Sequence, residues 1–174
     1  MNNIGIFYGS DTGNTKKIAK IIQKKINKNS KIYNISNVNK KTVEFYNILL
    51  FGIPTWYYGE PQNDWYNFFP ILKKINFNNK YVALFGCGDQ EDYSEYFCDA
   101  MKCIYDIIYP LKANIIGYWE NSGYFFEKSK SLLNNNKFIG LAIDEDRQPK
   151  LTNIRINKWI INLKKDLKLN NIII

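Results

Sequence analysis

The first candidate site in the sequence is a short polar loop, Gly9-Ser10-Asp11-Thr12-Gly13-Asn14-Thr15. An apolar run, Ile4–Tyr8, precedes it, and a segment with helical periodicity begins at Asn14. Backbone N–H groups at a helix N-terminus bind anions without a counter-charge. The three hydroxyls of the loop add donors, and its two glycines permit tight turns. This composition favours a phosphate monoester, although an ordinary capped turn has a similar composition. The loop matches neither GxxxxGK(S/T) nor GxGxxG, which disfavours hydrolysis of a magnesium-bound nucleotide.

Two further loops combine glycine with aromatic residues, Pro54–Gly59 and Gly86–Tyr93. Each follows an apolar run that reads as a central strand, where exposing an aromatic side chain gains little. A flat ligand stacked between Trp56 and Tyr93 explains both, although packing on neighbouring loops is the alternative. A phosphate at one loop and a flat ring between two others, joined by a short linker, describes FMN. No residue in the sequence is typical of a catalytic nucleophile paired with a base.

Alternating strands and helices must position these loops. We expect strands at Ile4–Tyr8, Ser30–Ile35, Ile48–Ile53, Tyr81–Phe85 and Ile115–Tyr118, with a second strand-like run at Phe138–Ile143 after the polar segment Trp119–Lys137. We expect helices from Asn14 to Ile26, at Asn63–Ile75 with a kink or end at Pro70, at Glu95–Leu111, and at Thr152–Leu167 with Thr152 as its cap. Five alternations predict an α/β fold with a parallel sheet covered on both faces. Ligands of such sheets bind beyond the carboxyl ends of the strands.

The length and the composition of the chain indicate one domain over residues 1–174 and a protein of the cytoplasm. The chain has 174 residues, 45% of them hydrophobic, and no apolar run long enough for a transmembrane helix. Its N-terminal segment reads as a strand and not as a signal peptide. Three cysteines without a CxxC spacing, Cys87, Cys98 and Cys103, indicate free thiols. Histidine is absent, which removes the commonest general base and transition-metal ligand.

The net charge of +8 raises the possibility of a nucleic-acid binder. Arginine, which such surfaces usually exploit, occurs only at Arg147 and Arg155, so lysine-rich composition drift is the simpler interpretation. No Lys or Arg occurs in residues 1–15, 54–72 or 86–101. Eleven of the sixteen acids fall in a few short stretches: Asp11, Glu60, Asp64, Asp89, Glu91, Asp92, Glu95, Asp99, Asp144, Glu145 and Asp146. We therefore expect one acidic face on a basic protein, with no nucleic-acid or membrane partner.

Four motifs in this sequence resemble those of long-chain bacterial flavodoxins, and are close to the enterobacterial flavodoxin 1 type. They are IGIFYGSDTGNT, LLFGIPTWYYGE, LFGCGDQEDYSEYF and GLAIDEDRQPKLT, in the same order and spacing. The resemblance covers nearly the whole chain. It implies a single-domain, three-layer α/β/α sandwich with a five-stranded parallel sheet of order 2-1-3-4-5, an order carried over from the family. It also implies that the segment Trp119–Lys137 is the insertion that splits the fifth strand.

The resemblance implies a set of FMN-binding residues. The residues implied to bind the phosphate group are Ser10, Asp11, Thr12, Gly13, Asn14 and Thr15. The loop beside the flavin ring is Pro54, Thr55, Trp56, Tyr57, Tyr58 and Gly59. The other wall is Cys87, Gly88, Asp89, Tyr93, Tyr96, Phe97 and Cys98, and Asp146 contacts the ribityl chain. The basic net charge departs from the usually acidic family.

The resemblance also implies an electron carrier rather than an enzyme. The expected donor is a ferredoxin/flavodoxin–NADP reductase, the expected acceptors are radical SAM or iron–sulfur enzymes, and an acidic rim on a monomer recruits both. The peptide between Tyr57 and Tyr58 would face flavin N5, and nearby acids would disfavour the fully reduced, anionic flavin. The main alternative is an FMN-dependent NAD(P)H:quinone oxidoreductase of the same fold. A receiver-type signalling domain is less consistent with strand Ile48–Ile53, which ends in Pro-Thr-Trp.

Overall fold

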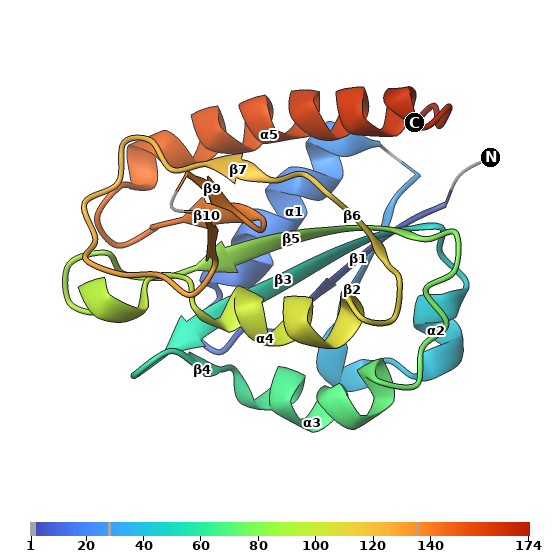
Figure 1. The fold of residues 1–174 in the computed structure, drawn as a ribbon, viewed down its shortest axis with the longest axis horizontal. Coiled ribbons are helices and arrows are strands. Elements are labelled where there is room, and N and C mark those ends of the chain that lie inside the picture. Colours follow the sequence, from blue (N-terminus) through green and yellow to red (C-terminus); the bar gives the residue numbers. More distant parts are fainter. Residues whose placement is uncertain (1–2, 28, 135) are drawn as a thin grey trace.

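A parallel sheet forms the centre of the protein (Figure 1). The computed structural model describes residues 3–27, 29–134 and 136–174. The strands run in the order β2 (Lys31–Asn34), β1 (Ile4–Tyr8), β3 (Ile48–Trp56) and β5 (Tyr81–Cys87), followed by a fifth position that β6 (Asn114–Ile116) and β10 (Leu141–Ile143) share. All of these pairings are parallel. The predicted fold class and strand order are therefore confirmed.

The fifth position of the sheet is split between two short strands. β6 pairs with Tyr81–Ala83 at the start of β5, and β10 pairs with Phe85–Cys87 at its end. The chain between them forms a small antiparallel sheet of β7 (Trp119–Glu120), β9 (Lys137–Phe138) and β8 (Leu132–Leu133). The insertion therefore lies at the position predicted from the sequence. Because β10 ends at the carboxyl edge of the sheet, the loop that follows it lies at that edge.

Helices cover both faces of the sheet (Figure 1). They are α1 (Asn14–Ile26), α2 (Lys40–Glu44), α3 (Asn63–Leu72), α4 (Ala100–Ile108) and α5 (Pro149–Leu169). α1 packs beside α5 on one face, and α3 packs beside α4 on the other. Within the described ranges, no helix combines the length and apolar character that crossing a bilayer requires.

Two buried tryptophans join these layers to the sheet. Trp65 of α3 packs edge-on against Phe51 of β3, with ring centroids 5.4 Å apart, and Trp159 of α5 packs against Phe85 of β5 at 6.3 Å. Their indole N–H groups donate to the carbonyls of Gly52 and Gly117 at 2.8 and 2.7 Å. Each side chain therefore buries a large apolar surface while its one polar atom keeps a partner, as burial requires.

Several predicted boundaries differ from the structure. β3 continues through Pro54 to Trp56, because β1 ends opposite Gly52 and a residue without an N–H then disturbs fewer ladder bonds. α3 continues past Pro70 but ends at Leu72. α4 begins at Ala100 and not at Glu95, since a 3₁₀ turn, η2 (Ser94–Tyr96), and the left-handed Cys98 (φ 55°) come first.

The predicted cap of the last helix is wrong. α5 begins at Pro149, one turn earlier than expected, and Thr152 lies inside it. The Thr152 hydroxyl donates to the carboxylate of Glu145 in the preceding loop. The short helix α2 was also not predicted, because its single turn holds one buried residue, Val43, and shows no periodicity.

Candidate functional site

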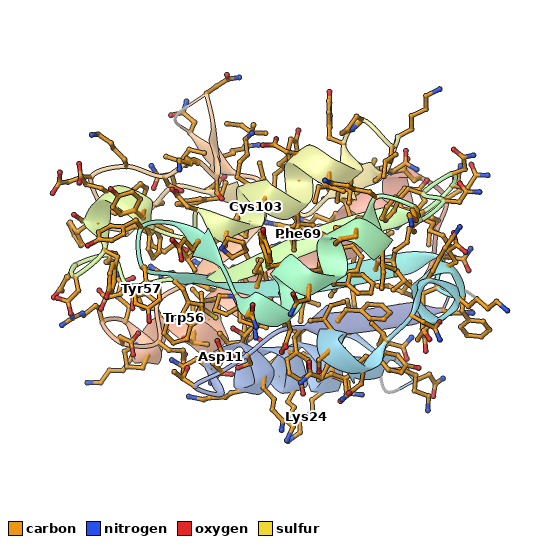
Figure 2. The ribbon with its side chains drawn as sticks, turned by 90° about the horizontal axis from the view of Figure 1, so that it is seen from below. Asp11, Lys24, Trp56, Tyr57, Phe69 and Cys103 are labelled. Carbon is orange, nitrogen blue, oxygen red and sulfur yellow. The ribbon has the colours of Figure 1, made fainter. Side chains whose placement is uncertain are left out.

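A cavity of about 250 Å³ lies at the carboxyl end of the sheet. Four loops contribute to it, those after β1, β3, β5 and β10. Its lining residues are Thr12, Asn14, Pro54, Thr55, Trp56, Tyr57, Cys87, Gly88, Asp89, Tyr93, Tyr96, Glu145 and Asp146. A second groove, lined by Asp11, Glu60 and Tyr66 among others, shares Trp56 and Tyr57 with this cavity. Figure 2 shows Asp11, Trp56 and Tyr57 near one another at one end of the molecule. The three loops selected from the sequence thus meet, and a fourth joins them.

The loop after β1 presents an open helix N-terminus. Gly13 is the residue before α1 and adopts a left-handed conformation, with φ 95°. Having no side chain, it cannot accept from the first-turn amides, which also lack partners inside the helix. The first turn contains no acidic residue, and the amide of Gly13 is itself held by the Ser10 hydroxyl at 3.1 Å. These amides and the positive end of the helix dipole are suited to an anion.

The loop after β3 is a tight turn that presents Trp56 to the cavity. Tyr57 and Gly59 both have positive φ, 41° and 92°, and the Gly59 amide closes the turn on the Trp56 carbonyl at 3.1 Å. Within the described residues, the buried indole N–H of Trp56 has no hydrogen-bond partner. A buried donor without a partner is costly and marks a place where a ligand acceptor fits.

The loop after β5 forms the facing wall. Tyr93 lines the cavity with 43% of its surface exposed. Gly88 is required here, because a Cβ at this position would lie 2.8 Å from the amide nitrogen of Cys98. The Gly88 amide donates to the Ile143 carbonyl at 3.1 Å, which ties this loop to β10.

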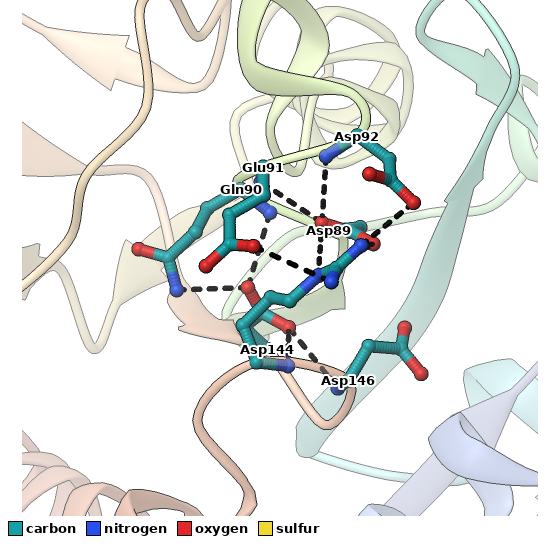
Figure 3. A network of polar contacts seen from close by, with 7 residues as sticks. Asp89, Gln90, Glu91, Asp92, Asp144 and Asp146 are labelled. Carbon is teal, nitrogen blue, oxygen red and sulfur yellow. Dashed lines mark hydrogen bonds and ion pairs between the residues drawn. The ribbon is translucent and has the colours of Figure 1, made fainter.

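The loop after β10 is organised by a fully buried carboxylate, Asp144 (Figure 3). Asp144 accepts from the backbone and side-chain nitrogens of Gln90 at 3.0 and 2.8 Å. It also accepts from the amides of Asp146 and Arg147 at 3.1 and 2.8 Å. Four donors compensate the buried charge, as such burial requires. They also direct Glu145 and Asp146 toward the cavity.

Comparisons with known proteins decide the family. The flavodoxin family model matches residues 6–159. The chain belongs to the flavodoxin family. It is 63% identical to a flavodoxin of Buchnera aphidicola (from Acyrthosiphon pisum) over 92% of this chain and 94% of the relative, and 57% identical to Escherichia coli K12 flavodoxin 1 over 97% of each. A crystal structure of Fusobacterium nucleatum flavodoxin bound to flavin mononucleotide matches with a TM-score of 0.89 at 36% identity, covering 95% of this chain and 99% of that one.

Most of the flavodoxin residues inferred from the sequence line this cavity, and some do not. Those outside its lining are Ser10, Asp11, Gly13, Thr15, Tyr58, Gly59, Phe97 and Cys98. Phe97 and Cys98 are fully buried, backbone and side chain together, and present no surface to the cavity. The Asp11 carboxylate accepts from Gln62 at 2.9 Å and faces the second groove. The full set remains a prediction.

Two buried thiols underlie the site. The hydroxyl of Thr15 lies 3.4 Å from Sγ of Cys87 and donates to it, joining the first helix to the end of β5. Burial raises the pKa of the Cys87 thiol to about 12 and that of Cys98 well above its ordinary value. All three cysteines are free, as the sequence indicated. Neither buried thiol is suited to act as a nucleophile.

The acidic face is smaller than the sequence suggested. Asp99 and Asp144 are buried beneath it, and burial raises the pKa of Asp99. Burial alone would raise the pKa of Asp89, but hydrogen bonds from Arg147 and two backbone amides hold it below its ordinary value. Burial, and then the neighbouring Asp144, raise the pKa of the cavity residue Asp146. The expected rim thus contains a cation as well as acids.

Sequence reasoning missed four residues of this arrangement: Gln90, Asp144, Glu145 and Arg147. Each lies inside a motif that was singled out, but Asp144 and Glu145 were expected only as part of the acidic face, and Gln90 and Arg147 received no role at the site. The available signal was the run Asp144-Glu145-Asp146-Arg147 directly after an apolar strand. Four charged residues at a strand end point to a site, although only the folded loop shows which of them face inward.

Proposed function

We propose that this flavodoxin-family chain is a one-electron carrier that holds FMN non-covalently in the 250 Å³ cavity. FMN is the cofactor that the family and the FMN-bound neighbour support. The observation that carries the proposal is the meeting of an open helix N-terminus with two aromatic walls at one end of the sheet. The residues present fit the parts of that cofactor.

Each part of FMN has matching residues at the cavity. The first-turn amides of α1, with the hydroxyl of Thr12, suit the phosphate group. Trp56 and Tyr93 line the same cavity from opposite loops and suit the two faces of a flat ring. The unpartnered indole N–H of Trp56 lacks an acceptor that a bound ligand can supply. Asp146, at the cavity wall, would accept a hydrogen bond from a hydroxyl of the ribityl chain.

FMN supplies the electron-accepting chemistry, and the protein supplies orientation and charge. The carbonyl of the peptide between Tyr57 and Tyr58 lies in the tight turn and would accept a hydrogen bond from flavin N5 when that atom carries a proton. Trp56 and Tyr93, which line the cavity, would exclude water from the faces of a bound ring. The carboxylates at the cavity disfavour added negative charge, since a unit charge at about 8 Å contributes roughly 1–2 kcal/mol at an effective dielectric of 20–40.

The same proposal includes the partners and the location. The donor is a ferredoxin/flavodoxin–NADP reductase, and the acceptors are radical SAM or iron–sulfur enzymes of the cytoplasm. Exposed acids around the cavity, including Glu91 and Asp92, would steer their basic patches toward a monomeric carrier. Reductase turnover with this protein should therefore slow as salt is raised from about 0.05 to 0.5 M, because the Debye length shortens. Turnover indifferent to salt would contradict this docking.

The first experiment is anaerobic stepwise photoreduction of the FMN-loaded protein, followed by visible absorbance. A one-electron carrier should be reduced in two separated steps, with a long-wavelength band at the midpoint. Direct passage to the fully reduced flavin, together with rapid NADPH oxidation by the protein alone, would favour the quinone oxidoreductase instead. Failure to bind FMN would contradict both.

A further inference from the structure

Arg147 pairs with three carboxylates beside the cavity, those of Asp89, Glu91 and Asp92. Figure 3 shows these three acids close to Asp144 and Asp146. Its Nε lies 3.1 Å from both carboxylate oxygens of Asp89, and its Nη2 lies 2.9 Å from Oδ2 of the same residue. Nη1 is 3.3 Å from Glu91, and Nη2 is 2.6 Å from Asp92. Planar two-nitrogen contacts of this kind are specific to arginine and are not reproduced by lysine.

This contact joins two walls of the cavity. Asp89 and Arg147 are 58 positions apart, on the loops that follow β5 and β10. Asp89 lines the cavity, as does Asp146 next to Arg147. The Asp89 carboxylate also accepts from the amides of Glu91 and Asp92, at 2.8 and 3.0 Å, so the arginine holds the turn that leads into Tyr93.

Among the residues that the structure describes, Arg147 is the cation that pairs with the 89–92 segment. Residues 86–101 contain no Lys or Arg, so the cation comes from the loop after β10. Other acids near the cavity pair with lysines by single contacts, Glu145 with Lys17 at 2.5 Å and Glu95 with Lys128 at 3.2 Å. Those lysines are 60% and 73% exposed, against 31% for the Arg147 side chain. A less exposed charge is screened less by solvent, and its effect on the cavity is correspondingly larger.

We propose that Arg147 is a positioning residue with two separable roles, one of shape and one of charge. Its fork holds the loop of Asp89 and Tyr93 against the loop after β10, which slows the escape of FMN. Its charge offsets the three carboxylates, which makes the reduced, more negative cofactor easier to hold. The proposal rests on the proposed FMN function and adds a residue to it.

Two substitutions separate the roles. Arg147→Lys keeps the charge and loses the fork, whereas Arg147→Gln loses both. We expect FMN to dissociate on the order of tenfold faster from both variants, since one charge-assisted pair is lost. The ratio of affinities for reduced and oxidised FMN should fall by about tenfold in Arg147→Gln, and stay within about twofold in Arg147→Lys. Lys128→Gln is the matched control, since it removes a single-contact cation from the same rim.

Amide hydrogen exchange in the FMN-free protein gives a readout that does not need the cofactor. The amides of Glu91 and Asp92 should exchange faster in both Arg147 variants, and at the original rate in Lys128→Gln. Unchanged exchange and unchanged FMN dissociation in both variants would overturn the shape role. Equal affinity ratios in the Lys and Gln variants would overturn the charge role. Faster exchange in a protein that never binds FMN would support the clamp while contradicting the proposed function.

Discussion

The carboxylate of Asp144 accepts from both the backbone amide and the side-chain amide of Gln90, across 54 positions of sequence. Gln90 in turn accepts from the amide of Phe125 at 2.7 Å. These bonds connect the loop after β10, the loop after β5 and the insertion in one buried network. Because the network joins loops that line the cavity, we expect its members to hold the cavity walls in place.

Removing that carboxylate should destabilise the protein strongly. Asp144→Ala leaves the amides of Gln90, Asp146 and Arg147 without their acceptor, which should lower the free energy of unfolding by about 3 kcal/mol. Urea denaturation of the FMN-free protein measures this. Asp106→Ala is the control, since this exposed acid pairs with Lys102 on its own helix and its loss should cost less than about 1 kcal/mol. Similar losses in both variants would contradict the buried network.

Tyr93 should contribute a stacking face to FMN binding. Tyr93→Ser should weaken FMN affinity by about 10- to 100-fold, the typical range for a base-like ring on an aromatic side chain, while Tyr93→Phe should stay within a few-fold. Quenching of flavin fluorescence on titration with the FMN-free protein measures both. Tyr109→Ser is matched, because Tyr109 is 60% exposed and stacks on Tyr105 at the far end of α4. Equal affinity in the Tyr93→Ser and control proteins would place the ring elsewhere.

Substitutions at Gly13 should show why glycine precedes α1, whether for its backbone conformation or for lack of room for a side chain. A Cβ at Gly13 would meet no atom within 4 Å, so a substitution there causes no clash and acts only through φ 95°. Gly13→Ala should therefore cost about 1–2 kcal/mol of stability, and Gly13→Asn less, since asparagine tolerates the left-handed region. Urea denaturation of the FMN-free variants measures this. An alanine variant as stable as the parent protein would show that the turn relaxes.

Asp99 should make stability depend on pH in the direction opposite to an ordinary salt-bridged acid. Burial raises its pKa in the folded protein, so the folded state holds its proton to higher pH than the unfolded state does. Stability should therefore fall as pH rises from the unfolded value near 3.9 through the raised folded value. Asp99→Asn keeps an acceptor for the Lys130 amide, at 2.7 Å from Oδ1 in the parent protein, and should be the more stable protein at pH 7.

The pH dependence of that gain is the decisive part of the measurement. Urea midpoints of Asp99→Asn and the parent should converge below about pH 4, where Asp99 is protonated in both states. Asp106→Asn serves as the control, because its side chain is 57% exposed on the surface of α4. A gain that persists unchanged at low pH would attribute the effect to packing and not to charge.

The exposed acids should lower the potential of the second reduction step. Glu91 and Asp92 are 61% and 69% exposed, and each has one contact with Arg147. Glu91→Gln with Asp92→Asn should therefore raise the affinity for fully reduced FMN relative to the oxidised form, by about tenfold at low salt and less at high salt. Reductive titration at two ionic strengths measures this. Unchanged potentials at both would mean that these charges do not reach the ring.

The positions of the long elements could be predicted because they depend on local pattern. The apolar run Ile48–Ile53 and the helical spacing from Asn14 to Ile26 each specify their element with neighbouring residues alone. The predicted ends of the helices and strands were wrong where tertiary contacts determine them. Cys98 adopts a left-handed conformation where its thiol faces the Gly86 carbonyl, and this delays α4 to Ala100 in a way that periodicity does not show.

The sequence by itself determined the family, the loops that meet at the carboxyl edge, and the aromatic residues that line the cavity. These follow from motifs and from the rule that parallel strands carry their ligands beyond their carboxyl ends. Only the tertiary structure decided how the charges pair. Arg147 pairs with Asp89 from 58 positions away, and Asp144 is buried and accepts from four donors. Acids that look alike in the sequence therefore differ in the fold. Asp89 joins two loops, Asp144 is a buried acceptor, and others form an exposed rim. Charge pairing depends on distance and burial, which the fold sets and local sequence does not.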